Sequence, residues 1–147
     1  MEPITVSIVV DRSAEEVFAY ATDPSRFSEW QKGVVGGRME SAGAPNVGDL
    51  CLTTRRIGFS DRPSTSEVVR FDPPYRWGVR GVDSPIRATV DVTVEPRTNT
   101  TAHLTIAVDF EGHGIGRLLV PLVVRREAQR EMPVNVKTLK ERLEASV

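Results

Sequence analysis

The stretch AEEVFAYATDPSRFSEWQKGV, Ala14–Val34, contains two short helical patterns in immediate succession. Ser13 precedes Glu16 by three residues, and this capping-box spacing predicts the start of a first helix. Asp23 and Pro24 give a second start signal, because Asp caps helices well and proline fits the first helical position. The chain therefore turns sharply between two brief helices before it continues.

Strand patterns lie on both sides of this segment. The preceding residues ITVSIVV alternate and predict a strand with one apolar face, made of Ile4, Val6, Ile8 and Val10. After Gly33 the pattern becomes strand, turn, strand, with expected strands at 34–41, 49–57, 65–71, 75–82, 86–95 and 101–111. The last two alternate most clearly, so we expect adjacent antiparallel strands with one dry face on which Val92 lies near Leu104.

The period becomes helical from Ile115 to Ala145. Its apolar stripe consists of Leu118, Leu122, Met132, Val136, Leu139 and Leu143. Pro121 falls near the first turn, but Pro133 removes a hydrogen bond to the Gln129 carbonyl and predicts a kink or break at 129–133. The order of elements predicts a single α+β domain over residues 1–147, in which the long helix covers the dry face of an antiparallel sheet.

Composition excludes several classes of partner. With 39% hydrophobic and 27% charged residues the chain is ordinary for a globular protein. Its 19 basic and 20 acidic residues give no electrostatic case for nucleic acid. The longest apolar run, Leu118–Val124, is far shorter than the ~20 residues of a membrane span, so we expect no stable membrane insertion. A lone cysteine, Cys51, and an N-terminus unlike a signal peptide predict a cytoplasmic protein, and the excess of arginine over lysine indicates a bacterium.

Three segments in order, EEVFAYATDPSRFSEWQKGV, VVRFDPPYRW and VNVKTLKERLEAS, resemble the SRPBCC superfamily. The resemblance is greatest to its START-like branch of polyketide cyclases/dehydrases and lipid-transport proteins. It implies a helix-grip fold, in which a curved seven-stranded antiparallel sheet wraps the C-terminal helix. It also implies an apolar cavity between them, with its mouth near the two short helices. A curved sheet with one helix does not fill its own interior, which agrees with a cavity of ligand size.

The candidate ligand-binding residues follow from this picture. They are Phe27, Trp30, Arg55, Glu67, Trp77, Phe110, Leu118 and Leu122. The aromatic side chains among them have core packing as an equally physical role, because aromatics dominate protein cores. For these residues the two interpretations overlap in a fold built around a cavity.

Arg55 and Glu67 raise a separate question. A symmetric hairpin around GFSDRPS places them opposite each other, and an inward pair would be expensive to desolvate unless it anchors a polar ligand. The alternative is a surface pair of small energetic value. Arg125 and Arg126 are most simply placed on the solvated face of the long helix.

No cofactor or metal is predicted. The two histidines, His103 and His113, fall on the wet face and in a glycine-rich connection, so they do not form a metal-binding triad with a carboxylate. EGHGIGR, from Glu111 to Arg117, lacks the spacing of a phosphate-binding loop. The sequence also has no nucleophile and base arrangement with a catalytic signature.

Three functions remain open. The first is a carrier or sensor of a small apolar molecule such as a lipid, polyketide or aromatic metabolite. The second is a polyketide cyclase or dehydratase that uses the same cavity, for which Glu67 and Arg55 are the candidate proton-transfer groups. The third is a partner-binding protein with a collapsed cavity. A continuous apolar cavity with two or more inward polar groups would favour the enzyme, a wholly apolar cavity would favour the carrier, and the absence of a cavity would favour the partner-binding protein.

Overall fold

The computed structural model describes residues 2–57 and 59–145. The N-terminal part consists of strand β1 (Ile4–Val10), helix α1 (Ala14–Ala21), the 3-10 turn η1 (Pro24–Arg26) and helix α2 (Phe27–Trp30). The strands that follow are β2 (Val34–Met39), β3 (Leu50–Ile57), β4 (Ser60–Asp72), β5 (Arg76–Gly81), β6 (Ile86–Thr98) and β7 (Thr101–Gly112). The chain then forms α3 (Gly116–Leu119), the π-helical turn η2 (Val120–Val124) and α4 (Arg125–Ala145).

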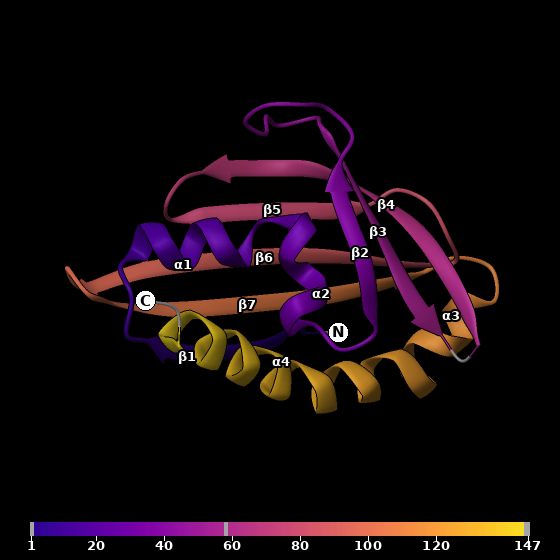
Figure 1. Ribbon diagram of the computed structural model, residues 1–147. Coiled ribbons are helices and arrows are strands. Elements are labelled where there is room, and N and C mark those ends of the chain that lie inside the picture. Colours follow the sequence, from indigo (N-terminus) through magenta and orange to yellow (C-terminus); the bar gives the residue numbers. More distant parts are fainter. Residues whose placement is uncertain (1, 58, 146–147) are drawn as a thin grey trace.

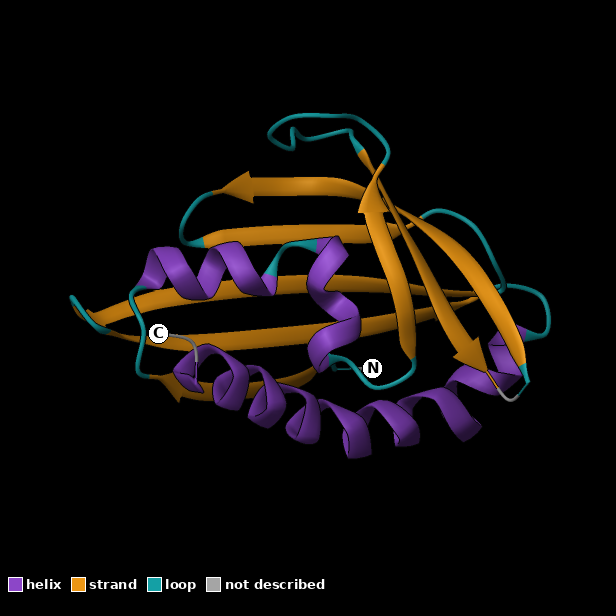
Figure 2. Cartoon of the chain, viewed as in Figure 1, coloured by secondary structure: helices purple, strands orange, loops and turns teal. Residues whose placement is uncertain are grey.

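The strands form one antiparallel sheet in the order β1-β7-β6-β5-β4-β3-β2. The sheet curls around α4, while α1 and α2 cross its concave side (Figure 1). Figure 2 shows the helices together on this side, which leaves the other face of the sheet uncovered by helices. The predicted helix-grip α+β fold is confirmed.

Both predicted caps form, but only the first α-helix begins where the sequence predicts. The Ser13 hydroxyl accepts a hydrogen bond from the backbone N–H of Glu16 at 3.2 Å, and the Asp23 carboxylate accepts one from that of Ser25 at 3.0 Å. After this second cap the chain forms a 3-10 turn before α2 begins. The pair of helices brings η1 against β2 and α2 against α4.

The dry face of the sheet is formed as the alternation predicts. Val92 and Leu104 are both buried on adjacent strands. Val92 lies directly opposite Ile106, and Leu104 lies opposite Val94, so the expected pair are diagonal neighbours in the same inner layer. The long helix covers this layer with four buried side chains, Met132, Val136, Leu139 and Leu143.

The long helix differs from the prediction at its prolines. It continues without a break through Pro133, so of the kink or break expected at 129–133 the break is wrong. Gln129 and Pro133 are both exposed, so the carbonyl that loses its helical donor is on a side that water reaches. The irregular turn falls instead at η2, which contains Pro121 near its start. Figure 1 shows α3 and α4 as one bowed helix that follows the curl of the sheet.

Candidate functional site

The inner face of the sheet is filled at one end and accessible at the other. Near α1, the inward side chains of β6 and β7 are buried, as Val94 and Leu104 show. Toward the opposite end, residues in the same inward register keep part of their surface accessible: Thr53, Ser64, Ser66, Ala88, Val90, Val108 and Phe110. We call this set, together with Arg55, the open half of the inner face.

The open half has an apolar wall and a polar wall. Strands β6 and β7 contribute the apolar wall, which includes Phe110. Strands β3 and β4 contribute hydroxyl groups, and the side-chain oxygens of Thr53 and Ser64 lie 3.1 Å apart. A surface of this mixed kind suits a ligand with an apolar body and a polar group.

The aromatic candidates lie in the filled part. Phe27 contacts Trp30 and Trp77 edge to face, with ring centroids 6.0 and 6.1 Å apart. Phe18 lies over Phe71 with a centroid distance of 6.2 Å. These rings close the inner face beneath the short helices, so the residual accessibility is not at the expected mouth but toward the β3–β4 turn. In the structure these rings pack against one another, and all but the partly buried Phe71 are buried.

Trp30 has one feature beyond packing. Its side chain is buried, and no described residue accepts a hydrogen bond from its indole N–H. A covered donor without an acceptor is costly, and indole groups in protein interiors usually have a partner.

Arg55 projects from the inner face of β3. It shares this face with buried Cys51 and lies opposite Val34 on β2 and Arg62 on β4. One guanidinium nitrogen donates to the Lys32 carbonyl at 3.4 Å.

Its surroundings combine accessibility with desolvation. The residue keeps accessible surface, yet the protein around its guanidinium lowers the pKa of Arg55 by desolvation, and the opposing charge of Glu131 on α4 partly offsets that effect. Arg55 is an exposed residue, and its register with Cys51 places its side chain on the inner face of the curled sheet. Arg55 is therefore a cation on the concave side of the sheet, facing the long helix.

The predicted pairing of Arg55 with Glu67 is wrong. Glu67 lies opposite Leu50 on β3 and Arg80 on β5, and it faces outward because its neighbour Val68 is fully buried on the inner side. Strands β3 and β4 pair as far as Ile57 and Ser60, which makes the hairpin tighter than expected. A bulge between Val68 and Arg70 then reverses the alternation, so the inward position of Phe71 does not extend back to Glu67.

Leu118 and Leu122 do not face the sheet. Their residues are 62% and 59% exposed, while Gly116 and Val120 are the buried positions of this segment. The π-helical turn changes the phase between the first turns and α4, so one helical stripe does not continue from 118 to 143. The prediction assumed one helical period from Leu118 to Leu143, and the π-helical turn makes that assumption wrong.

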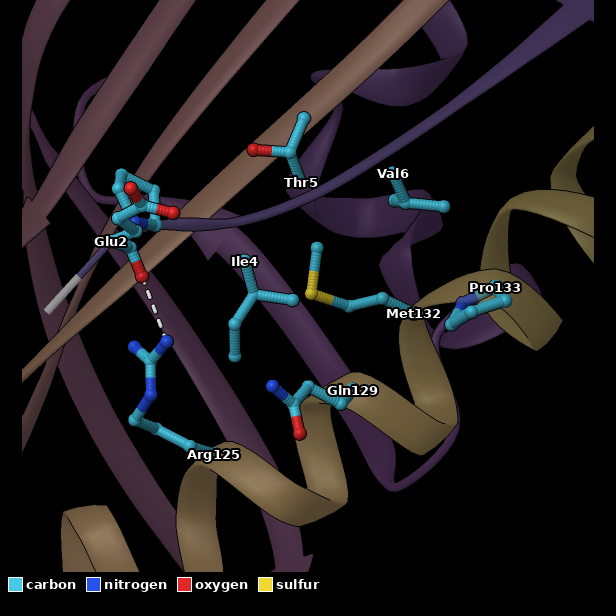
Figure 3. A pocket seen from close by; sticks show the side chains of 9 residues that line it. Glu2, Ile4, Thr5, Val6, Arg125, Gln129, Met132 and Pro133 are labelled. Atoms are coloured by element: carbon cyan, nitrogen blue, oxygen red, sulfur yellow. Dashed lines mark hydrogen bonds between the residues drawn. The ribbon is translucent and has the colours of Figure 1, made fainter.

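Arg125 lies elsewhere than the sequence indicates. Its side chain is only 15% exposed, its Nη2 donates to the Glu2 carbonyl at 2.7 Å, and its Nη1 lies 3.7 Å from an Asp109 carboxylate oxygen. Together with Gln129 and Met132 it lines a groove of about 380 Å³ between β1 and α4, shown in Figure 3. The Arg125 side chain therefore joins α4 to the edge of the sheet through Glu2 and Asp109 instead of facing solvent.

The histidines are held apart. The His113 Nε2 lies 3.0 Å from a Glu111 carboxylate oxygen, and His103 lies between Val9 and Glu95 on the sheet. Among residues 2–57 and 59–145 there is no group of three or more side chains of His, Cys, Asp or Glu placed to hold a metal. No helix in this part of the chain is long and apolar enough to cross a membrane.

Comparison with known proteins places the chain. The family model described as polyketide cyclase/dehydrase and lipid transport matches residues 1–144. The chain belongs to this family. A search of curated proteins finds no significant match.

Solved structures share the fold of this family member at low sequence identity. A START superfamily protein from Mycobacterium smegmatis is 13% identical, with 100% of both chains covered and a TM-score of 0.79. The Zhui aromatase/cyclase from Streptomyces sp. R1128 is 11% identical, with 97% of this chain and 93% of that chain covered and a TM-score of 0.78. The di-domain ARO/CYC BexL from the BE-7585A biosynthetic pathway is 18% identical, with 98% and 47% covered and a TM-score of 0.76. The present chain thus spans about half the length of that two-domain protein.

Proposed function

We propose that this protein binds a small molecule with an apolar body and a polar or anionic group between the open half of the inner face and α4. The observation that carries the proposal is Arg55, an inner-face guanidinium that is partly desolvated but accessible. The ligand body would lie on the apolar wall of β6 and β7, and its polar group would reach the guanidinium. The cytoplasmic location stays a prediction.

The energetics support an anionic or strongly polar group. A cation surrounded by protein loses hydration, and a hydrogen-bonded opposite charge best compensates that loss. Among the described residues, Arg55 forms no ion pair within 4.0 Å, and Glu131 acts on it only as a more distant charge. A carboxylate or enolate oxygen would fit, because guanidinium binds planar oxyanions with two parallel hydrogen bonds.

A second function, cyclase or dehydratase, has an observation of its own. The open half contains several inward polar groups rather than a wholly apolar surface, and Glu131 faces the Arg55 charge from the helix side. With the two groups on opposite sides of a bound chain, the guanidinium would hold a carbonyl or enolate oxygen by hydrogen bonds and the carboxylate would take up and return protons, which is the work such reactions need. The printed family description includes both this activity and lipid transport.

The binding proposal is tested by replacing Arg55. Native mass spectrometry of gently purified protein is expected to show a retained organic molecule, and Arg55→Gln should lower its occupancy by about 10-fold or more, as for loss of a charged hydrogen bond. Arg56→Gln is the matched control, because Arg56 is the next residue of β3, faces outward and pairs with Asp61 at 2.8 Å. Equal retention by the two variants would refute the role of Arg55.

The same material separates carrier from enzyme. The molecule extracted from wild-type protein is compared with the one extracted from a Glu131→Gln variant purified in parallel. Identical masses together with identical ultraviolet spectra indicate carriage. A wild-type molecule lighter by one water, or isomeric with a different ultraviolet spectrum, indicates dehydration or cyclisation.

A further inference from the structure

Three connections of the sheet meet at one end of the molecule. Strands β3, β5 and β7 run in the same direction in the antiparallel sheet, so their C-terminal ends lie at the same edge. The backbone N–H of His113 donates to the Pro85 carbonyl at 2.7 Å, which fixes the start of the helical region on the β5–β6 turn. We call the segments 55–57, 59–62, 80–87 and 111–126 the turn end, seen on the right in Figure 1.

Exposed apolar side chains gather at the turn end. Of the eleven large hydrophobic side chains that are exposed among the described residues, six belong to it: Phe59, Val82, Ile115, Leu118, Leu122 and Val123. Phe59 is fully exposed beside the tip of the β3–β4 hairpin, and Leu118 is 62% exposed. Concentrations of exposed apolar surface of this kind mark interaction sites.

The turn end is also strongly basic. Its segments contain eight arginines and three carboxylates, whereas the rest of the chain has eleven basic and seventeen acidic residues. Arg55 lies on the inner face and Arg125 is turned toward Asp109, so six of the eight arginines remain for the surface of this end: Arg56, Arg62, Arg80, Arg87, Arg117 and Arg126. The net charge of -1 therefore conceals a positive end and a negative remainder. Arginines interspersed with protruding apolar side chains fit a surface that is anionic outside and apolar beneath.

We propose that the turn end docks reversibly on the surface of an anionic lipid bilayer. The apolar groups project from a hairpin and from the outer side of a helix, as the exposure of Phe59, Leu118 and Leu122 shows. A bilayer accepts such projections without a complementary shape, whereas a protein partner needs a matching groove. The open half of the inner face lies toward the same end, so docking brings the ligand site to the membrane. Only the statement that docking brings the ligand site to the membrane rests on the proposed function.

Vesicle flotation tests the docking surface. The full chain is expected to float with vesicles of equal parts phosphatidylcholine and phosphatidylglycerol, and not with phosphatidylcholine alone. High salt should release it, since the screening length falls from about 10 Å at 0.1 M to about 3 Å at 1 M. Phe59→Ser combined with Leu118→Ser should weaken binding at least about tenfold, and Arg117→Glu about fivefold or more.

Matched controls come from the same chain. Val47→Ser and Val134→Ser remove side chains that are 63% and 56% exposed but lie outside the turn end, and Arg97→Glu reverses an exposed charge next to the β6–β7 turn. These variants should float like wild type. No flotation of wild type, equal losses in the controls, or concentration-dependent dimerisation that Phe59→Ser abolishes would overturn the proposal. Retention of a small molecule, measured by native mass spectrometry, reports on the ligand site independently.

Discussion

Replacing Val92 with Asp is expected to remove a large part of the protein's stability at neutral pH. Val92 is 3% exposed on the inner face of β6, between Trp77 of β5 and Ile106 of β7. These neighbours offer no charge, so a carboxylate here loses its hydration without compensation and costs about 4 kcal/mol. That is a large part of the 5–15 kcal/mol that stabilises a typical domain. Thermal and urea unfolding measure the loss.

The pH dependence gives this prediction a second readout. Burial would raise the pKa of the introduced Asp above its unfolded value, so the penalty is present at neutral pH and shrinks as the pH falls toward about 4. The control is Thr93→Asp, one residue along on the outer face and opposite Arg76, where a change within about 0.5 kcal/mol is expected. Equal stability of the two variants would contradict the assignment of Val92 to the inner face, and a larger loss for Thr93→Asp would show that the two faces of β6 are exchanged.

The sequence predicts the parts of this fold that depend on local chemistry. Ser and Asp side chains cap helices in many contexts, and Ser13 and Asp23 do so here. The alternation along β6 and β7 follows from the geometry of a half-buried sheet. Resemblance to the superfamily supplied the curvature and the grip of the helix, which no single segment specifies. Both kinds of information describe the frame of the site rather than its contents.

Which residues belong to the site depends on the phase of the strand and helix periods. This phase changes at two irregularities that the sequence pattern does not reveal. The bulge after Val68 turned Glu67 outward, and the π-helical turn exposed Leu118 and Leu122. A one-residue irregularity reverses every later position of a strand, and its occurrence is decided by tertiary packing. Arg55 precedes the bulge, and its inward position does not depend on it.

Groups that act between distant segments were also missed. The contact of Arg125 with Glu2 and Asp109 joins a helix to the free edge of the sheet, and adjacent arginines in the sequence give no sign of which one turns inward. The unpartnered indole of Trp30 likewise depends on what the fold brings near it. The basic turn end is an exception, because its composition can be taken from the sequence once the strand order shows that its segments lie together.

Gly37→Ala is expected to destabilise the protein by about 1–3 kcal/mol, as overpacking of a well-packed contact does. A Cβ at this position would lie 2.6 Å from the carbonyl oxygen of Pro24, so the backbone of η1 rests directly on β2. Because the obstacle is backbone, the whole segment has to move, and Phe27 and Trp30 would move with it. Thermal unfolding and the emission maximum of tryptophan should both change.

The neighbouring glycine makes this prediction specific. A Cβ at Gly36 would meet nothing within 4 Å, so Gly36→Ala should leave stability unchanged or raise it slightly through the lower entropy of the unfolded chain. The two substitutions are chemically identical and one residue apart, and they are expected to have different signs. Similar effects would show that η1 does not contact β2 closely. Opposite effects would explain the short helices: they carry the chain across the concave face and fasten it to β2, which positions the strand beside Arg55.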